Sequence, residues 1–148
     1  MEFAIIGVLL FTLLFGVLEM GRLYFTVEAL NEVVRRGARL AAVCSPTVAT
    51  DVDNLKQLAV FNGRGGTGPS PLIMNLNPGD LTLNYLDGLG VDRGPGFDSI
   101  RYVQVSIQGF QFRLLIPGVG GSFTLPPFRA TLPSESLGYD GESGVTQC

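Results

Sequence analysis

The chain contains no histidine and no tryptophan, and charged residues fill only 16% of its 148 positions. Histidine is the commonest general base and the commonest metal ligand, so its absence excludes Ser/His/Asp and Cys/His arrangements. The net charge of −3 argues against a nucleic-acid surface, which needs a clustered basic footprint. The carboxylates show no catalytic pattern either. We therefore expect no enzyme, and neither a cofactor, a metal nor a small-molecule substrate.

Cysteine is scarce as well, with Cys44 and Cys148 as the two representatives. They are too few for a zinc site alone and do not form a CxxC pair. In an exported chain two cysteines most simply pair with each other, so we expect a disulfide between Cys44 and Cys148. An intersubunit bond and free thiols are the alternatives.

Apolar residues are concentrated in the first forty positions. The run from Phe3 to Leu18 carries no charge and lies between Glu2 and Glu19. As a helix it is ~24 Å long, a little less than the ~20 residues that cross a bilayer. Extension to Phe25 makes it long enough but includes Glu19 and Arg22, whose i,i+3 spacing lets them pair. We expect Glu2 and Glu19 near the membrane interfaces or neutralised by a partner.

The helical pattern continues beyond the apolar run. Apolar residues recur at three-and-four spacing from Leu23 to Ala41, with polar side chains on the other side. Ser45-Pro46 then breaks the pattern. The sequence therefore predicts one helix of about forty residues, on the order of 60 Å long. Its first half suits a bilayer, and its second half covers a folded domain.

Three other interpretations of this segment are weaker. A cleaved signal peptide has a basic start and a small-residue cleavage site after the apolar run, and neither is present. Residues 40–44 (LAAVC) faintly resemble a lipoprotein box but lie far beyond that run. A plain single-span anchor for an unrelated domain would explain the length of the apolar run and nothing more.

The remainder predicts a β-rich head domain over residues 45–148, following a helix domain over residues 1–44. A short helix is expected near 52–61, capped by Thr50 or Asp51. Strands are expected at 81–85, at 100–115 with a bulge at Gly109, and at 123–132 as an edge interrupted by two prolines. The fold class is therefore α+β, with a long helix packed on a small antiparallel sheet.

Two glycine-rich loops are candidates for phosphate or calcium binding. Residues 63–71 lack the Gly-Lys-Ser/Thr ending of a phosphate-binding loop. Residues 87–98 place three carboxylates among glycines, at Asp87, Asp92 and Asp98. This spacing fits no EF-hand, so turns are favoured, while calcium binding stays open.

The segment Glu2 to Ala42 resembles the TadE-like pilins of tight-adherence pili. The resemblance rests on an acidic-aromatic-Ala start (residues 2–4), on the FGVLEMGR motif (residues 15–22) and on RRGAR (residues 35–39). Related pilins carry their acidic residue fifth in the mature chain, whereas here it is second. This fits either a mature terminus other than Met1 or a different cleavage spacing.

The resemblance implies an inner-membrane precursor that a peptidase processes and the pilus assembly machinery builds into an extracellular, homo-oligomeric filament for adhesion. Glu2 would pair with a neighbour's N-terminal amine, and Glu19 and Arg22 with each other or across subunits, so that reversing either charge alone impairs assembly more than swapping both. Gly7 and Gly16 would allow close packing or local loosening, although glycines are also common in membrane helices. The alternative function is a membrane-retained minor pilin that primes assembly.

Overall fold

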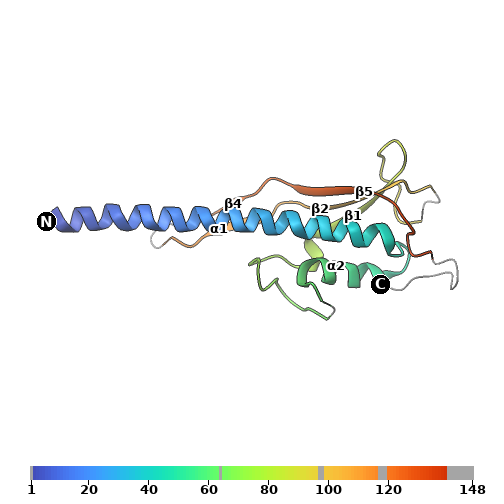
Figure 1. Cartoon of the computed structure of the whole chain (residues 1–148), viewed down its shortest axis with the longest axis horizontal. Helices are drawn as coiled ribbons and strands as arrows, with labels where there is room; N and C mark the ends of the chain where they lie inside the picture. Colours follow the sequence, from blue (N-terminus) through green and yellow to red (C-terminus); the bar gives the residue numbers. More distant parts are fainter. Residues whose placement is uncertain (1, 64, 97–98, 117–119, 140–148) are drawn as a thin grey trace.

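The computed structural model describes residues 2–63, 65–96, 99–116 and 120–139. One long helix runs the length of the molecule, and a small mixed head domain packs on its C-terminal half (Figure 1). The N-terminal half of the helix extends away from the head. The predicted α+β fold, a long helix with a small antiparallel sheet, is confirmed.

Helix α1 spans Glu2–Val43 as one uninterrupted element of 42 residues. The apolar run and the amphipathic segment thus form a single helix, which ends shortly before Pro46 as the sequence predicts. It is long and apolar enough to cross a membrane. Its most apolar window of 18 residues has a mean hydropathy of 2.4 and buries none of its residues inside the chain.

Helix α2 spans Ala49–Phe61, so it begins three residues before the expected start at residue 52. The prediction of Thr50 or Asp51 as the N-cap residue is wrong. Val48 occupies the N-cap position and makes no side-chain hydrogen bond there. The buried Asp51 instead lies in the first turn, where a carboxylate interacts favourably with the helix dipole. Asn62 ends the helix in the left-handed conformation, and its N–H donates to the carbonyl of Leu58.

The strands form two antiparallel sheets. In the larger sheet β1 (Leu81–Leu86), which follows the 3-10 turn η1 (Pro78–Asp80), pairs with β2 (Tyr102–Ile107), and β2 pairs with β5 (Phe128–Pro133). In the smaller sheet β3 (Gln111–Leu114) pairs with β4 (Gly121–Thr124).

The expected strands at 100–115 and 123–132 are therefore each divided in two. The first expected strand is divided near Gly109, which has a φ of 68°. The second is divided at Pro126-Pro127, because proline has no N–H to donate to a neighbouring strand. The N–H of Leu125 still bonds the carbonyl of Phe110, so the β3–β4 hairpin continues from β2 and β5.

The hydrophobic core lies between α2, the larger sheet and the second half of α1. Leu30, Val34, Ala38 and Ala41 of α1 are at most 1% exposed. Gly37 lies at the closest approach, since a Cβ built there would be 3.2 Å from Val105 Cγ1 and 3.5 Å from Ala59 Cβ. Small residues on this face let the helix approach β2 and α2 together.

Candidate assembly surface

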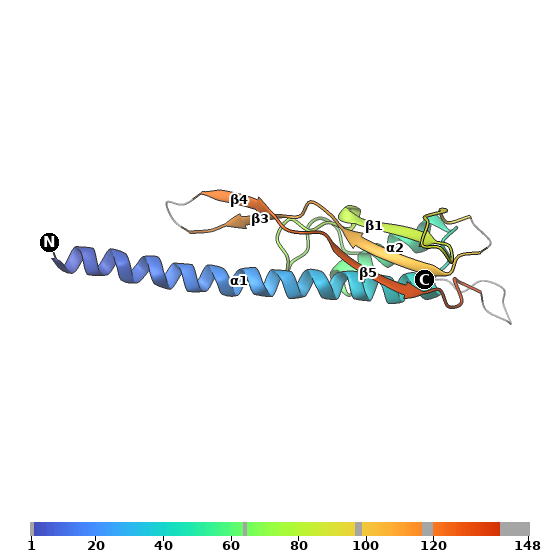
Figure 2. The same cartoon turned by 90° about the horizontal axis from the view of Figure 1, so that it is seen from above.

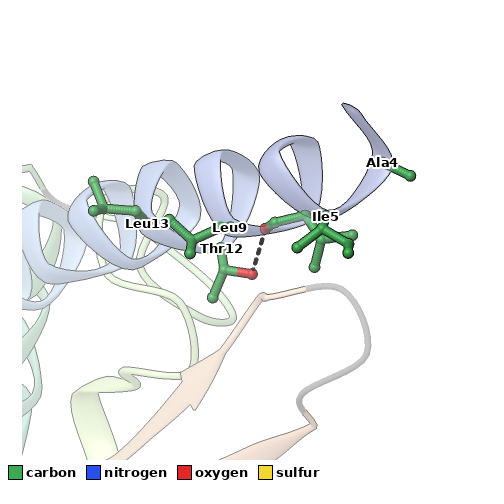
Figure 3. A pocket seen from close by; sticks show the side chains of 6 residues that line it. Ala4, Ile5, Leu9, Thr12 and Leu13 are labelled. Atoms are coloured by element: carbon green, nitrogen blue, oxygen red, sulfur yellow. Dashed lines mark hydrogen bonds between the residues drawn. The ribbon is translucent and has the colours of Figure 1, made fainter. Parts of the chain in front are cut away.

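The first half of α1 presents a continuous apolar surface. The large apolar side chains from Phe3 to Leu18 expose between 37% and 88% of their surface. Figure 3 shows Ile5, Leu9 and Leu13 projecting from the helix beside Thr12, whose hydroxyl donates to the carbonyl of Val8 at 2.8 Å. The six side chains that line this pocket come from one helix, so the pocket is a face of α1 and not an enclosed cavity. A surface of this size requires a covering partner.

Glu19 and Arg22 lie at the end of this surface and form an ion pair within α1. The same two side chains also hold the β3–β4 hairpin. The N–H of Leu115 donates to Glu19 Oε1 at 3.3 Å, and Arg22 Nη2 donates to the carbonyl of Arg113. The Arg22 guanidinium also lies 4.2 Å from the centre of the Phe112 ring, within range of a cation–π interaction. Sequence reasoning anticipated the pair but missed its contact with the hairpin.

The other predicted assembly residues lie on the same half of α1. Glu2 is the first residue of the helix, and its side chain lies outside the described part of the structure. Gly7 and Gly16 are in continuous helix, and a Cβ at either position would meet nothing within 4 Å. The helix is therefore not loosened at these glycines in the single chain. Their role in close packing between copies stays a prediction.

A basic groove lies where α1 packs beside β5. Arg35, Arg39 and Arg129 line it, together with residues 130–132, and it encloses about 460 Å³. In the described part of the chain none of these arginines forms a salt bridge, whereas the neighbouring Arg36 pairs with Glu32 at 3.6 Å. Such a groove can accept carboxylates or other anions. The i,i+4 spacing of Arg35 and Arg39 was a signal for it, but the sequence could not place Arg129 beside them.

The loop after β1 uses its carboxylates to hold its own backbone. Asp87 Oδ1 accepts from the N–H groups of Leu89 and Val91 at 2.8 and 3.0 Å, and Asp87 Oδ2 accepts from Arg93 Nε at 3.0 Å. These bonds, that from Val91 first, hold the pKa of Asp87 below its ordinary value.

Asp92 has a similar role, since its Oδ1 accepts from the N–H groups of Tyr85 and Gly94. These contacts support the interpretation of the described residues 87–96 as turns. Asp98, the third carboxylate of the possible calcium loop, lies outside the described residues. Within the described residues no group of three or more His, Cys, Asp or Glu side chains could hold a metal ion.

The predicted disulfide involves one described cysteine. Cys44 lies directly after α1 and is 2% exposed. Cys148 lies outside the described residues, so the bond stays a prediction. The chain nevertheless returns toward Cys44, because the carbonyl of Ala42 accepts from the N–H groups of Glu135 and Leu137 at 3.0 and 3.3 Å.

Residues 1–39 match the TadE-like protein family. No curated protein and no solved structure matches the chain. The matched segment includes the exposed apolar surface, the Glu19–Arg22 pair and the two groove arginines of α1. The resemblance of the N-terminal segment to the TadE-like proteins is thereby confirmed for residues 1–39, which make up most of α1.

Proposed function

We propose that the chain is a structural pilin subunit. It is held in the inner membrane by α1 and then assembles into an extracellular helical filament. One observation carries the proposal: the two halves of a single helix have opposite surroundings. The second half buries one face in the head domain, whereas the first half leaves every large apolar side chain from Phe3 to Leu18 at least 37% exposed.

Two environments can cover such a helix half. The bilayer does so before assembly, because the helix has the length and composition of a membrane span. A bundle of the same helices from other copies does so afterwards. Contacts between different faces of identical subunits repeat without closing and produce an open filament.

The hydrophobic effect alone does not drive the step from bilayer to bundle, because lipid tails are as apolar as the helices. Close packing and polar pairs have to contribute. Gly7 and Gly16 offer positions for close helix approach, and Glu2 offers a charge for a neighbour's amine. The basic groove at Arg35, Arg39 and Arg129 could receive carboxylates of a neighbouring copy, since the chain carries a net charge of −3.

The TadE-like match over residues 1–39 supports a pilus-associated protein and is compatible with both a filament subunit and a minor pilin that primes assembly. Shearing surface filaments from cells separates the two. A filament subunit should be the dominant protein of the sheared fraction. If the chain instead remains in the membrane fraction while filaments of another protein are sheared off, the subunit proposal fails. Neither function requires catalysis by this chain.

A further inference from the structure

The β3–β4 hairpin extends along α1 beyond the head domain. Figure 2 shows both strands projecting from the larger sheet toward the N-terminal half of the helix. The hairpin is anchored by the contacts of Glu19 and Arg22 with the backbone at Leu115 and Arg113. Its rings also pack together, with the centres of Phe112 and Phe123 5.3 Å apart. Its position on α1 is therefore fixed at the end of the apolar surface.

The described residues on either side of the hairpin turn include exposed apolar side chains. No charged residue occurs in the sequence between Arg113 and Arg129. Leu115 is 53% exposed and Phe123 is 39% exposed, so the head domain does not bury them. Ile116 faces α1 and lines, with Phe11 and Phe15 among others, a groove of about 490 Å³. These side chains need an apolar environment outside the chain.

The level of the hairpin relative to a bilayer follows from α1. Glu19 is sixteen residues after Phe3, which is ~24 Å of helix, while the hydrocarbon core of a bilayer is ~30 Å thick. With Phe3 at one boundary, Glu19 reaches no further than the opposite boundary. Leu115 bonds Glu19, and Ile116 reaches the helix N-terminal to it. Leu115 and Ile116 therefore lie at or just inside the head-side boundary of the bilayer.

We propose that the β3–β4 hairpin is a second membrane element, whose Leu115 and Ile116 side chains enter the head-side boundary of the bilayer that α1 crosses. The proposal rests on the membrane anchoring of α1 in the proposed function. Lipid acyl chains fill the groove between Ile116 and α1, which extends along the helix from Phe3 to Phe15.

The insertion is shallow for a physical reason. A two-stranded hairpin has two outer edges with unpaired backbone N–H and C=O groups, and such edges are not tolerated in the hydrocarbon interior. At the boundary, water and headgroups satisfy these edges while the side chains contact acyl chains. The hairpin therefore sets the depth and rotation of α1 without crossing the membrane.

Tryptophan fluorescence tests this directly, because the chain has no tryptophan of its own. The full chain carrying Leu115→Trp is reconstituted into phosphatidylethanolamine/phosphatidylglycerol vesicles with brominated acyl chains, which quench nearby tryptophan. Leu9→Trp, in the apolar run, is the control for deep insertion. Leu89→Trp is the control for a site in water, because Leu89 is 88% exposed in the loop after β1.

We expect Leu115→Trp to be quenched, and more strongly by bromine near the glycerol end of the acyl chain than by bromine near its methyl end. Leu9→Trp should be quenched more strongly by the deeper bromine, and Leu89→Trp should be unaffected. Ile116→Trp is the second reporter and should behave as Leu115→Trp does. If both hairpin reporters are as unquenched as Leu89→Trp while Leu9→Trp is quenched, the hairpin proposal is overturned and the anchoring of α1 stands. If Leu9→Trp is also unquenched, both are overturned.

Discussion

Glu19 Oε1 accepts a hydrogen bond from the backbone N–H of Leu115 at 3.3 Å, across ninety-six residues of sequence. The carboxylate is only 13% exposed and is also paired with Arg22, which in turn bonds the carbonyl of Arg113. A side-chain pair of α1 thus binds one donor and one acceptor of the hairpin backbone. This explains how a short hairpin outside the head core keeps its position.

The first prediction concerns this contact. Glu19→Ala should release the hairpin, because the N–H of Leu115 loses its acceptor and Arg22 loses its ion-pair partner. Loss of a charge-assisted hydrogen bond of about 1.5 kcal/mol should speed exchange of the Leu115 amide roughly tenfold. Amide hydrogen exchange in detergent micelles measures this. Glu32→Ala is the matched control, since Glu32 pairs with Arg36 on the helix surface, and it should leave the Leu115 amide unchanged.

The sequence alone predicts that exchanging the charges of Glu19 and Arg22 does less harm than reversing either one. The contacts with the hairpin change what we expect for the exchange. The double variant Glu19→Arg, Arg22→Glu restores an ion pair within α1. It also brings a guanidinium to the N–H of Leu115 and a carboxylate to the carbonyl of Arg113, and both contacts are repulsive. We expect fast exchange at Leu115 in this variant too. A protected amide there would mean that the pair acts on the hairpin without direct hydrogen bonds.

A second prediction concerns Glu2, at the start of the apolar surface. Glu2→Gln should leave membrane insertion intact and reduce or abolish filaments, because a carboxylate in an apolar bundle needs a charged partner and a neighbour's amine can be that partner. Sheared filaments and membrane fractions are compared by immunoblot. Glu28→Gln removes one exposed carboxylate from the second half of α1 and should assemble normally. Normal filaments in the Glu2 variant would contradict the proposed role.

The sequence predicted the elements that depend on local patterns. The apolar run and the amphipathic spacing that follows it correctly indicated one helix to Val43, and the alternation at Leu81 correctly indicated β1. The hairpin contact and the basic groove could not be predicted, because each joins α1 to a strand about ninety residues away. Local sequence periodicity does not indicate which strand packs beside which turn of a helix. The divided strands show the same limit, since Gly109 suggested a bulge within one sheet and the structure has two sheets.

The third prediction concerns Gly37, where α1 is closest to β2 and α2. Gly37→Leu should destabilise the head domain by about 1–3 kcal/mol, because the side chain would overpack against Val105 and Ala59. Gly21→Leu is the control on the same helix, since a Cβ there meets nothing within 4 Å. Urea unfolding in detergent micelles measures both. Equal stability of the two variants would contradict the close approach at Gly37.

The fourth prediction is a pH dependence from Asp87. Backbone N–H donors and Arg93 lower the pKa of this carboxyl in the folded chain below its ordinary value of 3.8. The charged carboxylate therefore stabilises the fold fully above pH 3.8, and this contribution is lost as the pH falls from 3.8 through the folded pKa. Asp87→Asn should be less stable than the unmodified chain at neutral pH, and the difference should shrink in acid.

Urea unfolding across this pH range measures the difference. Asp53→Asn, which removes an exposed carboxylate from α2, controls for the change in net charge. A stability difference for Asp87→Asn that persists unchanged well below pH 3.8 would show that the hydrogen bonds of the loop do not depend on the charge of Asp87.

The last prediction is the disulfide between Cys44 and Cys148. Residues 135 and 137 bond the carbonyl of Ala42, so the chain runs beside the end of α1 before its last nine residues. Nine residues can span up to about 30 Å, which is ample for a return to Cys44. The loop that the bond closes contains about a hundred residues and would stabilise the fold by ~4–5 kcal/mol in the chain-entropy model.

Non-reducing electrophoresis with thiol alkylation tests the bond on purified filaments or membranes. We expect a monomer that runs faster without reductant and resists alkylation until it is reduced. Cys44→Ser and Cys148→Ser should each abolish the shift and lower the free energy of unfolding by similar amounts, because either change opens the same loop. Two freely alkylated cysteines would rule the bond out. A reductant-sensitive dimer would instead assign the cysteines to a bond between subunits, so that the tail is fixed to a neighbouring copy and not to its own helix.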